Sequence, residues 1–143
     1  MPASLTLVTI NADKDPFNPK SLLNLPNLEI LKIYGDATPF WKCDFSHMTR
    51  LRQVHFEGDY LTQWNSSMDK LGNLTHVVVS AELKKIPSSF FTHCTKIEYL
   101  NLDVSRMTFI FINFINNNLQ FNHLKKISNK ISLLKNLRHF SAR

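Results

Sequence analysis

Apolar residues recur along the chain in one pattern, in which an apolar residue is followed three and five positions later by two more. The first members of successive copies stand at positions 5, 28, 51, 74 and 97, a constant interval of 23. A random sequence with this apolar content would fill all fifteen positions with a probability on the order of 10⁻⁶. The framework positions are Leu5/Val8/Ile10, Leu28/Leu31/Ile33, Leu51/Val54/Phe56, Leu74/Val77/Val79 and Ile97/Leu100/Leu102.

Each copy predicts one coil of a solenoid, made of a short strand, a turn and an irregular or 3-10 return segment. A coil of this kind cannot close its own core and buries its apolar side chains against its neighbours. A further column lies just before each of the later copies, at Leu25, Met48, Leu71 and Cys94. The 143 residues suit one domain, and we predict an α/β solenoid of about six coils, with parallel strands on its concave side.

The pattern weakens after residue 103. Phe114 and Leu119 begin what resembles a further coil, and Leu137 begins another, one full interval after Phe114. The step from Ile97 to Phe114 is shorter than this interval, so one coil is shortened or the register slips. We therefore divide the domain, residues 1–143, into regular repeats over 5–103 and irregular coils over 104–143.

The two ends of such a solenoid are open. Apolar side chains of the first coil, such as Leu5 and Val8, and of the last, Leu137 and Phe140, have no further coil to cover them. Exposed apolar faces favour association, so we expect a marginally stable or self-associating chain, for which a homodimer is one possible form.

Composition excludes two classes of protein. The hydrophobic fraction of 43% is too high for a disordered tail. The longest apolar stretch, residues 107–115, is far shorter than the roughly twenty residues that span a membrane, so we expect no membrane segment in this chain. The first residues, Met-Pro-Ala-Ser-Leu, lack the pattern of a signal peptide, which predicts a cytosolic protein or a piece of a longer one.

The net charge of +6 is unevenly distributed. Residues 1–103 carry ten basic and eleven acidic side chains, whereas residues 104–143 carry seven basic and no acidic ones. A basic segment that also contains Phe121 and Phe140 is compatible with an RNA-binding tail. The alternative, which we favour, is the solvated outer face of a coil, so nucleic acid is not expected as a partner. The basic residues are Arg106, Lys125, Lys126, Lys130, Lys135, Arg138 and Arg143.

Two cysteines are too few for a disulfide scaffold or a four-cysteine zinc site. Cys94 falls in the column of buried apolar residues and is predicted to be a small buried hydrophobe. Cys43 lies two coils away in another column, so a disulfide between them is not expected.

The sequence contains no catalytic motif, paired catalytic carboxylates, phosphate-binding loop or dinucleotide fingerprint. We therefore predict that the protein is not an enzyme and needs no cofactor. His55 and His76 fall on neighbouring strands, close enough to suggest a metal site. Glu57 is the one candidate for a third ligand, and such a group of three arises easily by chance, so no metal is predicted. The histidines are His47, His55, His76, His93, His123 and His139.

Strand residues between the framework positions face away from the core, because side chains alternate along a strand. Together they form a patch that combines aromatic rings, amides and both charges, as protein-binding surfaces often do. The patch is either a ligand-binding surface or a solvated sheet face. Successive strands lie about 4.8 Å apart, so Glu29 and Arg52 are expected to form an ion pair beside it. The candidate ligand-binding residues are Lys32, Tyr34, Arg52, Gln53, His55, Glu57, His76, Tyr99 and Asn101.

Over residues 5–103 the repeat resembles that of leucine-rich repeat proteins. Asp13, Asp36, Asp59, Glu82 and Ser105 stand where that family carries an Asn that links neighbouring coils by hydrogen bonds. An acidic side chain in that position can accept such bonds but cannot donate them. We therefore expect an imperfect ladder.

Residues 74–102 are similar to repeats in the extracellular region of insect Toll receptors, with a strand, then Glu-Leu-Lys-Lys-Ile-Pro, then Ser-Ser-Phe-Phe. This resemblance implies a horseshoe-shaped receptor fragment, extracellular or secreted, that binds a protein ligand or co-receptor in innate-immune or developmental signal transduction. Two glycosylation sequons, at Asn65 and Asn73, fit this view if both side chains face solvent, although such triplets also arise by chance. The alternative is a cytoplasmic repeat protein that acts as an adaptor or substrate-recognition subunit.

Overall fold

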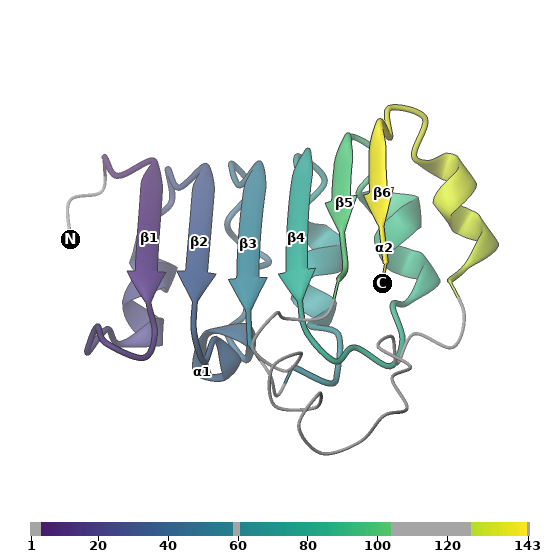
Figure 1. The fold of residues 1–143 in the computed structure, drawn as a ribbon. Helices are drawn as coiled ribbons and strands as arrows, with labels where there is room; N and C mark the ends of the chain where they lie inside the picture. The colour runs from purple at the N-terminus through teal and green to yellow at the C-terminus, as the bar shows by residue number, and fades with distance from the viewer. Residues whose placement is uncertain (1–3, 59–60, 104–126, 143) are drawn as a thin grey trace, which may run out of the picture.

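The computed structural model describes residues 4–58, 61–103 and 127–142. In these residues six short strands form one parallel sheet, in which the strands follow one another in chain order (Figure 1). The strands are β1 (Leu7–Asn11), β2 (Ile30–Tyr34), β3 (Gln53–Glu57), β4 (His76–Ser80), β5 (Tyr99–Asn101) and β6 (His139–Ser141).

The repeat of the sequence is the register of the first five strands. Leu7 pairs with Ile30, Ile30 with Gln53, Gln53 with His76, and His76 with Tyr99. Each strand therefore presents to its neighbour the residue that occupies the same place in the next copy of the pattern. The predicted repeat is confirmed over β1 to β5.

The return segments lie together on one side of the sheet (Figure 1). Three of them are 3-10 helices, each preceded by a polar residue, Asn18, Asn65 or Ser128, whose side chain accepts a hydrogen bond from the backbone N–H two positions later. The predicted solenoid of short parallel strands with 3-10 and irregular returns is confirmed, with two short α-helices added. These elements are η1 (Pro19–Asn24), α1 (Thr38–Trp41), η2 (Ser66–Lys70), α2 (Ser88–His93) and η3 (Asn129–Leu133).

The core lies between the sheet and the return segments. Fourteen of the fifteen framework side chains are buried, and Leu5, in the first coil, is half-buried. Aromatic rings link three consecutive coils, since Trp41 packs edge-on against Phe56 and Trp64, and Trp64 packs against Phe90. Stability therefore comes from contacts between neighbouring coils, as in other solenoids.

Cys94 is fully buried among the apolar side chains of its column, as predicted. Burial, and then the nearby Asp69 carboxylate, raise the pKa of its thiol to about 12. Cys43 is half-buried, and burial raises its pKa as well. Both are free thiols, and the neutral form that burial favours makes each a poor nucleophile.

The last strand corrects one prediction about the irregular region. A coil beginning at Phe114 would place a strand between β5 and β6, yet Tyr99 of β5 pairs directly with His139 of β6. Residues 104–126, including Phe114 and Leu119, lie outside the described part of the chain. The coil predicted to begin at Leu137 is present and contains β6.

The prediction of uncovered apolar side chains at the two ends holds only in part. Val8 in the first coil is buried in the core, and Leu5 and Leu137 are half-buried, so the prediction is wrong for these residues, whereas it is confirmed for Phe140. Leu7 on β1 is 50% exposed and Phe140 on β6 is 41% exposed, whereas Leu100, which pairs with Phe140, is fully buried.

The acidic residues in place of the usual Asn form part of a ladder. The Asp13 carboxylate accepts a hydrogen bond from the Asp36 backbone N–H, 2.9 Å away in the next coil. Asp36 in turn accepts one from the N–H of Thr38 in its own coil. Gly35 stands beside Asp13 with a φ of 80°, and a Cβ at this position would overlap the Asp13 carboxylate. The two acids accept and do not donate, as expected.

Candidate functional site

The side of the sheet opposite the return segments, which we call the open sheet face, carries the predicted ligand-binding residues. Strand pairing arranges their side chains in columns that run across the sheet. One column contains Leu7, Ile30, Gln53, His76, Tyr99 and His139, and the next contains Thr9, Lys32, His55, Val78, Asn101 and Ser141. On β2, β3 and β4 these residues are half-buried, because the period of two along each strand buries only the intervening residues.

A hollow of about 340 Å³ lies on this face, and we call it the sheet groove. Six of the nine predicted residues line it, together with Val54 and Val78. Val78 supplies apolar surface, whereas the Val54 side chain is buried in the core. The lining residues are Lys32, Gln53, Val54, His55, His76, Val78, Tyr99 and Asn101.

Tyr34 and Glu57 border the groove through His55. The rings of Tyr34 and His55 are in contact, with centroids 4.8 Å apart. The Nε2 atom of His55 lies 2.9 Å from a carboxylate oxygen of Glu57. Both side chains of this pair are partly solvated, so the pair positions His55 and adds little stability.

Three aromatic rings, which we call the ring stack, lie one against the next at one end of the groove. His76 and Tyr99 have centroids 5.9 Å apart and planes inclined by 12°. Tyr99 and His139 have centroids 4.3 Å apart and planes inclined by 8°. Because the Tyr99 ring is in contact with another ring on each face, its orientation is restricted.

His139 was not among the predicted ligand-binding residues. His139 lies much more than one repeat interval after its partner Tyr99. A comparison of residues one interval apart therefore does not pair the two. The pattern of Leu137 and Phe140 is the signal that could have found it, because a strand in that register places His139 in the Tyr99 column.

Arg52 lies apart from the groove, near the start of β3. It lines a smaller hollow, about 220 Å³ in volume, together with Glu29, Arg50 and Asn73. The predicted ion pair between Glu29 and Arg52 is absent among the described residues, where the pair of charged groups within 4 Å is His55 and Glu57. The two residues are instead linked through the backbone, by a hydrogen bond from the Arg52 N–H to the Glu29 carbonyl.

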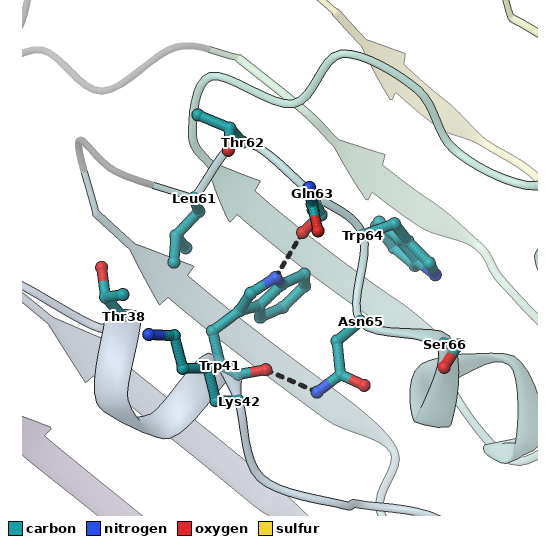
Figure 2. A pocket seen from close by; sticks show the side chains of 9 residues that line it. All are labelled: Thr38, Trp41, Lys42, Leu61, Thr62, Gln63, Trp64, Asn65 and Ser66. Carbon is teal, nitrogen blue, oxygen red and sulfur yellow. Dashed lines mark hydrogen bonds between the residues drawn. The ribbon is translucent and has the colours of Figure 1, made fainter.

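A third hollow, about 360 Å³ in volume, lies among the return segments (Figure 2). The Trp41 indole closes its floor and donates a hydrogen bond from Nε1 to the Gln63 carbonyl, 2.7 Å away. The nine lining residues are Thr38, Trp41, Lys42, Leu61, Thr62, Gln63, Trp64, Asn65 and Ser66.

Asn65 is a structural residue in this region, and its side chain is half-buried. Its Nδ2 atom donates to the carbonyls of Trp41 and Cys43 in the preceding coil, at 2.6 and 2.8 Å, and Figure 2 shows the first of these bonds. Its Oδ1 atom accepts from the backbone N–H and the hydroxyl of Ser67. The expectation that both sequon asparagines face solvent is therefore wrong for Asn65.

Asn73, by contrast, is exposed. Its Nδ2 atom donates to the Thr49 carbonyl at 2.8 Å, and its Oδ1 atom accepts from the Lys96 ammonium at 2.7 Å. One amide hydrogen remains for other chemistry, because the amide nitrogen carries two.

No protein-family model matches the chain, and no curated protein does. Among solved structures, the chain is similar to a leucine-rich repeat protein of Leptospira interrogans, at 16% sequence identity and a TM-score of 0.45. That likeness covers 97% of this chain and 50% of the Leptospira protein, so this chain spans about half the length of that protein.

The sequence predicted neither a metal site nor a membrane-spanning helix. Within residues 4–58, 61–103 and 127–142, His, Cys, Asp and Glu form no group of three that could hold a metal ion. No helix in this part of the chain is long and apolar enough to cross a membrane. Of the seven basic C-terminal residues, Lys130, Lys135 and Arg138 are exposed, while the other four, Arg106, Lys125, Lys126 and Arg143, lie outside the described residues.

Proposed function

We propose that this protein is a non-enzymatic recognition module that binds a protein ligand or co-receptor through the open sheet face. The observation that carries the proposal is the sheet groove, because it joins an apolar floor, amides, a cation and two rings of the ring stack, His76 and Tyr99, in one hollow. Tyrosine held rigidly in a pocket is a frequent anchor of protein interfaces, since it offers a large contact area at little conformational cost.

The proposal predicts that the ring stack dominates binding. Peptides selected by phage display on the immobilised protein should bind the double variant His76→Ala/Tyr99→Ala at least about 10-fold more weakly, because truncation of an interface anchor costs about 2 kcal/mol or more. Isothermal titration calorimetry measures the change.

The matched control is Lys84→Ala/Lys85→Ala, which truncates two exposed side chains in the segment between β4 and α2. This variant should bind the selected peptides as the wild type does. Circular dichroism verifies that both variants are folded. Equal affinities of the wild type, the ring-stack variant and the control would refute binding at this face.

We further propose that the module belongs to the extracellular part of a receptor similar to insect Toll receptors and takes part in signal transduction. The similarity of residues 74–102 to Toll repeats supports this proposal, and the exposed sequon at Asn73 is compatible with it. The alternative is a cytoplasmic adaptor or substrate-recognition protein with the same binding face.

Glycosylation distinguishes the two settings. After secretion from insect cells, the protein should lose the mass of one N-linked glycan on glycosidase treatment, and Asn73→Gln should abolish that loss. In the same secreted protein Asn65 should carry no glycan, as mass spectrometry of its proteolytic peptides would measure, because both amide hydrogens of Asn65 are already bound to carbonyls. A secreted protein without any glycan would favour the cytoplasmic alternative.

A further inference from the structure

The charges around the sheet groove indicate the chemistry of its ligand, if binding occurs at this face as proposed above. Of the described residues that line the groove, Lys32 is the one with a fixed charge, and none is acidic. Among the described residues, the Lys32 ammonium has no hydrogen-bond or ion-pair partner. The groove therefore presents an uncompensated cation.

Two carboxylates at or just after the ends of strands β3 and β5 of this sheet have hydrogen-bond partners of their own. Glu57 accepts from His55 at 2.9 Å, and Asp103 accepts from the Ser141 hydroxyl at 2.7 and 2.9 Å. Neither lies within 4 Å of the Lys32 ammonium, so neither forms an ion pair with it. A partner that covers the half-buried Lys32 removes water from its ammonium, and this is unfavourable unless the partner supplies a negative charge.

The other end of the groove suits a different side chain. Val78 forms apolar floor beside Tyr99, whose ring is held by His76 and His139. An incoming aromatic ring meets the exposed edge of Tyr99, and edge-to-face contact is a favoured geometry for two rings.

The distance between these two ends sets the spacing in the ligand. Lys32 on β2 and Tyr99 on β5 are separated by three strand intervals and by two positions along the strand. At about 4.8 Å per interval and 3.3 Å per residue, this amounts to ~16 Å, the length of four or five residues of extended chain. We infer that the sheet groove binds an extended acidic peptide segment, with a carboxylate at Lys32 and an aromatic side chain at Tyr99, four or five residues apart.

Synthetic peptides of eight residues test this inference on the full chain. The reference peptides are built from serine and threonine, have blocked ends, and carry one aspartate followed four or five positions later by a phenylalanine. Comparison peptides replace the aspartate with asparagine, the phenylalanine with serine, or shorten the spacing to two. Blocked ends remove the terminal charges that would otherwise confuse the comparison.

At least one reference peptide should bind. Asparagine in place of aspartate should weaken its binding several-fold, since a charge-assisted hydrogen bond is roughly twice as strong as a neutral one. Serine in place of phenylalanine, or the shorter spacing, should weaken it similarly, because each removes the aromatic contact with Tyr99. In Lys32→Glu the preference should reverse, so that a peptide with lysine in place of aspartate binds more tightly than the reference. Lys84→Glu changes an exposed lysine outside the groove and should retain the wild-type preference. A preference that declines as salt is added would agree with a partly solvated charge pair.

Two outcomes would overturn the inference. One is that aspartate and asparagine peptides bind equally while His76→Ala/Tyr99→Ala still weakens the binding of both. In that case the groove binds peptides regardless of their charge, so the inference is wrong while the proposed function is retained. If no peptide of the set binds at millimolar concentration, the inference is wrong, and the display selection still decides whether this face binds proteins.

Discussion

Phe56→Ala is expected to lower the free energy of unfolding by about 3–5 kcal/mol, the usual cost of removing a buried phenylalanine ring. Phe56 is fully buried on β3, in the middle of the sheet. Its ring contacts Trp41 and Phe45 with centroids 5.0 and 5.6 Å away. The alanine would leave a cavity beside these rings, and Trp41 is held in place by its contact with Trp64 and its hydrogen bond to the Gln63 carbonyl.

The effect should be large because the chain is a solenoid. Coils contact only their neighbours, so a defect in the third coil weakens the connection between the first half of the array and the second. Small domains have a total stability of about 5–15 kcal/mol, so the loss should remove a large share of the stability of the protein.

Phe140→Ala is the matched control, since it makes the same chemical change at a position that is 41% exposed. Urea unfolding, followed by tryptophan fluorescence, should give a midpoint close to that of the wild type for this control and a much lower one for Phe56→Ala. Similar midpoints for the two variants would contradict the assignment of Phe56 to the core.

Asn65→Asp is expected to lower the free energy of unfolding by about 2–4 kcal/mol, because it leaves two carbonyl groups without donors, each at a typical cost of about 1–3 kcal/mol. The substitution keeps the shape of the side chain and replaces the NH₂ group by an oxygen. That oxygen would face the carbonyls of Trp41 and Cys43, to which Asn65 now donates at 2.6 and 2.8 Å. The result is repulsion where two coils are now joined.

Asn73→Asp provides the control, because Asn73 donates to the Thr49 carbonyl in the same manner but is exposed. Water can replace the lost donor there, and the new carboxylate stays close to the Lys96 ammonium. Thermal unfolding should therefore be nearly unchanged for Asn73→Asp and clearly lowered for Asn65→Asp. Equal effects would mean that Asn65 does not link the coils.

The sequence predicted the strands, their register and the buried columns because these features repeat with one period. A residue such as Val54 is recognised as buried once Leu31 and Val77 are seen one period away on either side. The same register placed six residues of the sheet groove correctly, since it decides which side chains share a face.

Features without a period could not be predicted in this way. The role of Asn65 depends on the path of one return segment, and these segments vary in length and type from coil to coil. The failed pairing of Glu29 with Arg52 depends on side-chain conformation, which strand spacing does not determine. His139 was missed because its coil comes after a longer step along the chain.

That longer step has a consequence for how sequence can be inserted into this fold. The residues of β1 to β5 find their partners one period away, whereas Tyr99 and His139 are separated by nearly two periods and still pair in parallel. In polymer terms, closing the longer loop costs only about 0.5 kcal/mol more, because loop entropy grows with the logarithm of length. A strand can therefore join the sheet by matching its framework residues to the last coil even when the chain before it is longer than one period. The connection between two coils is thus a place where this fold can gain new sequence without changing the order of its strands.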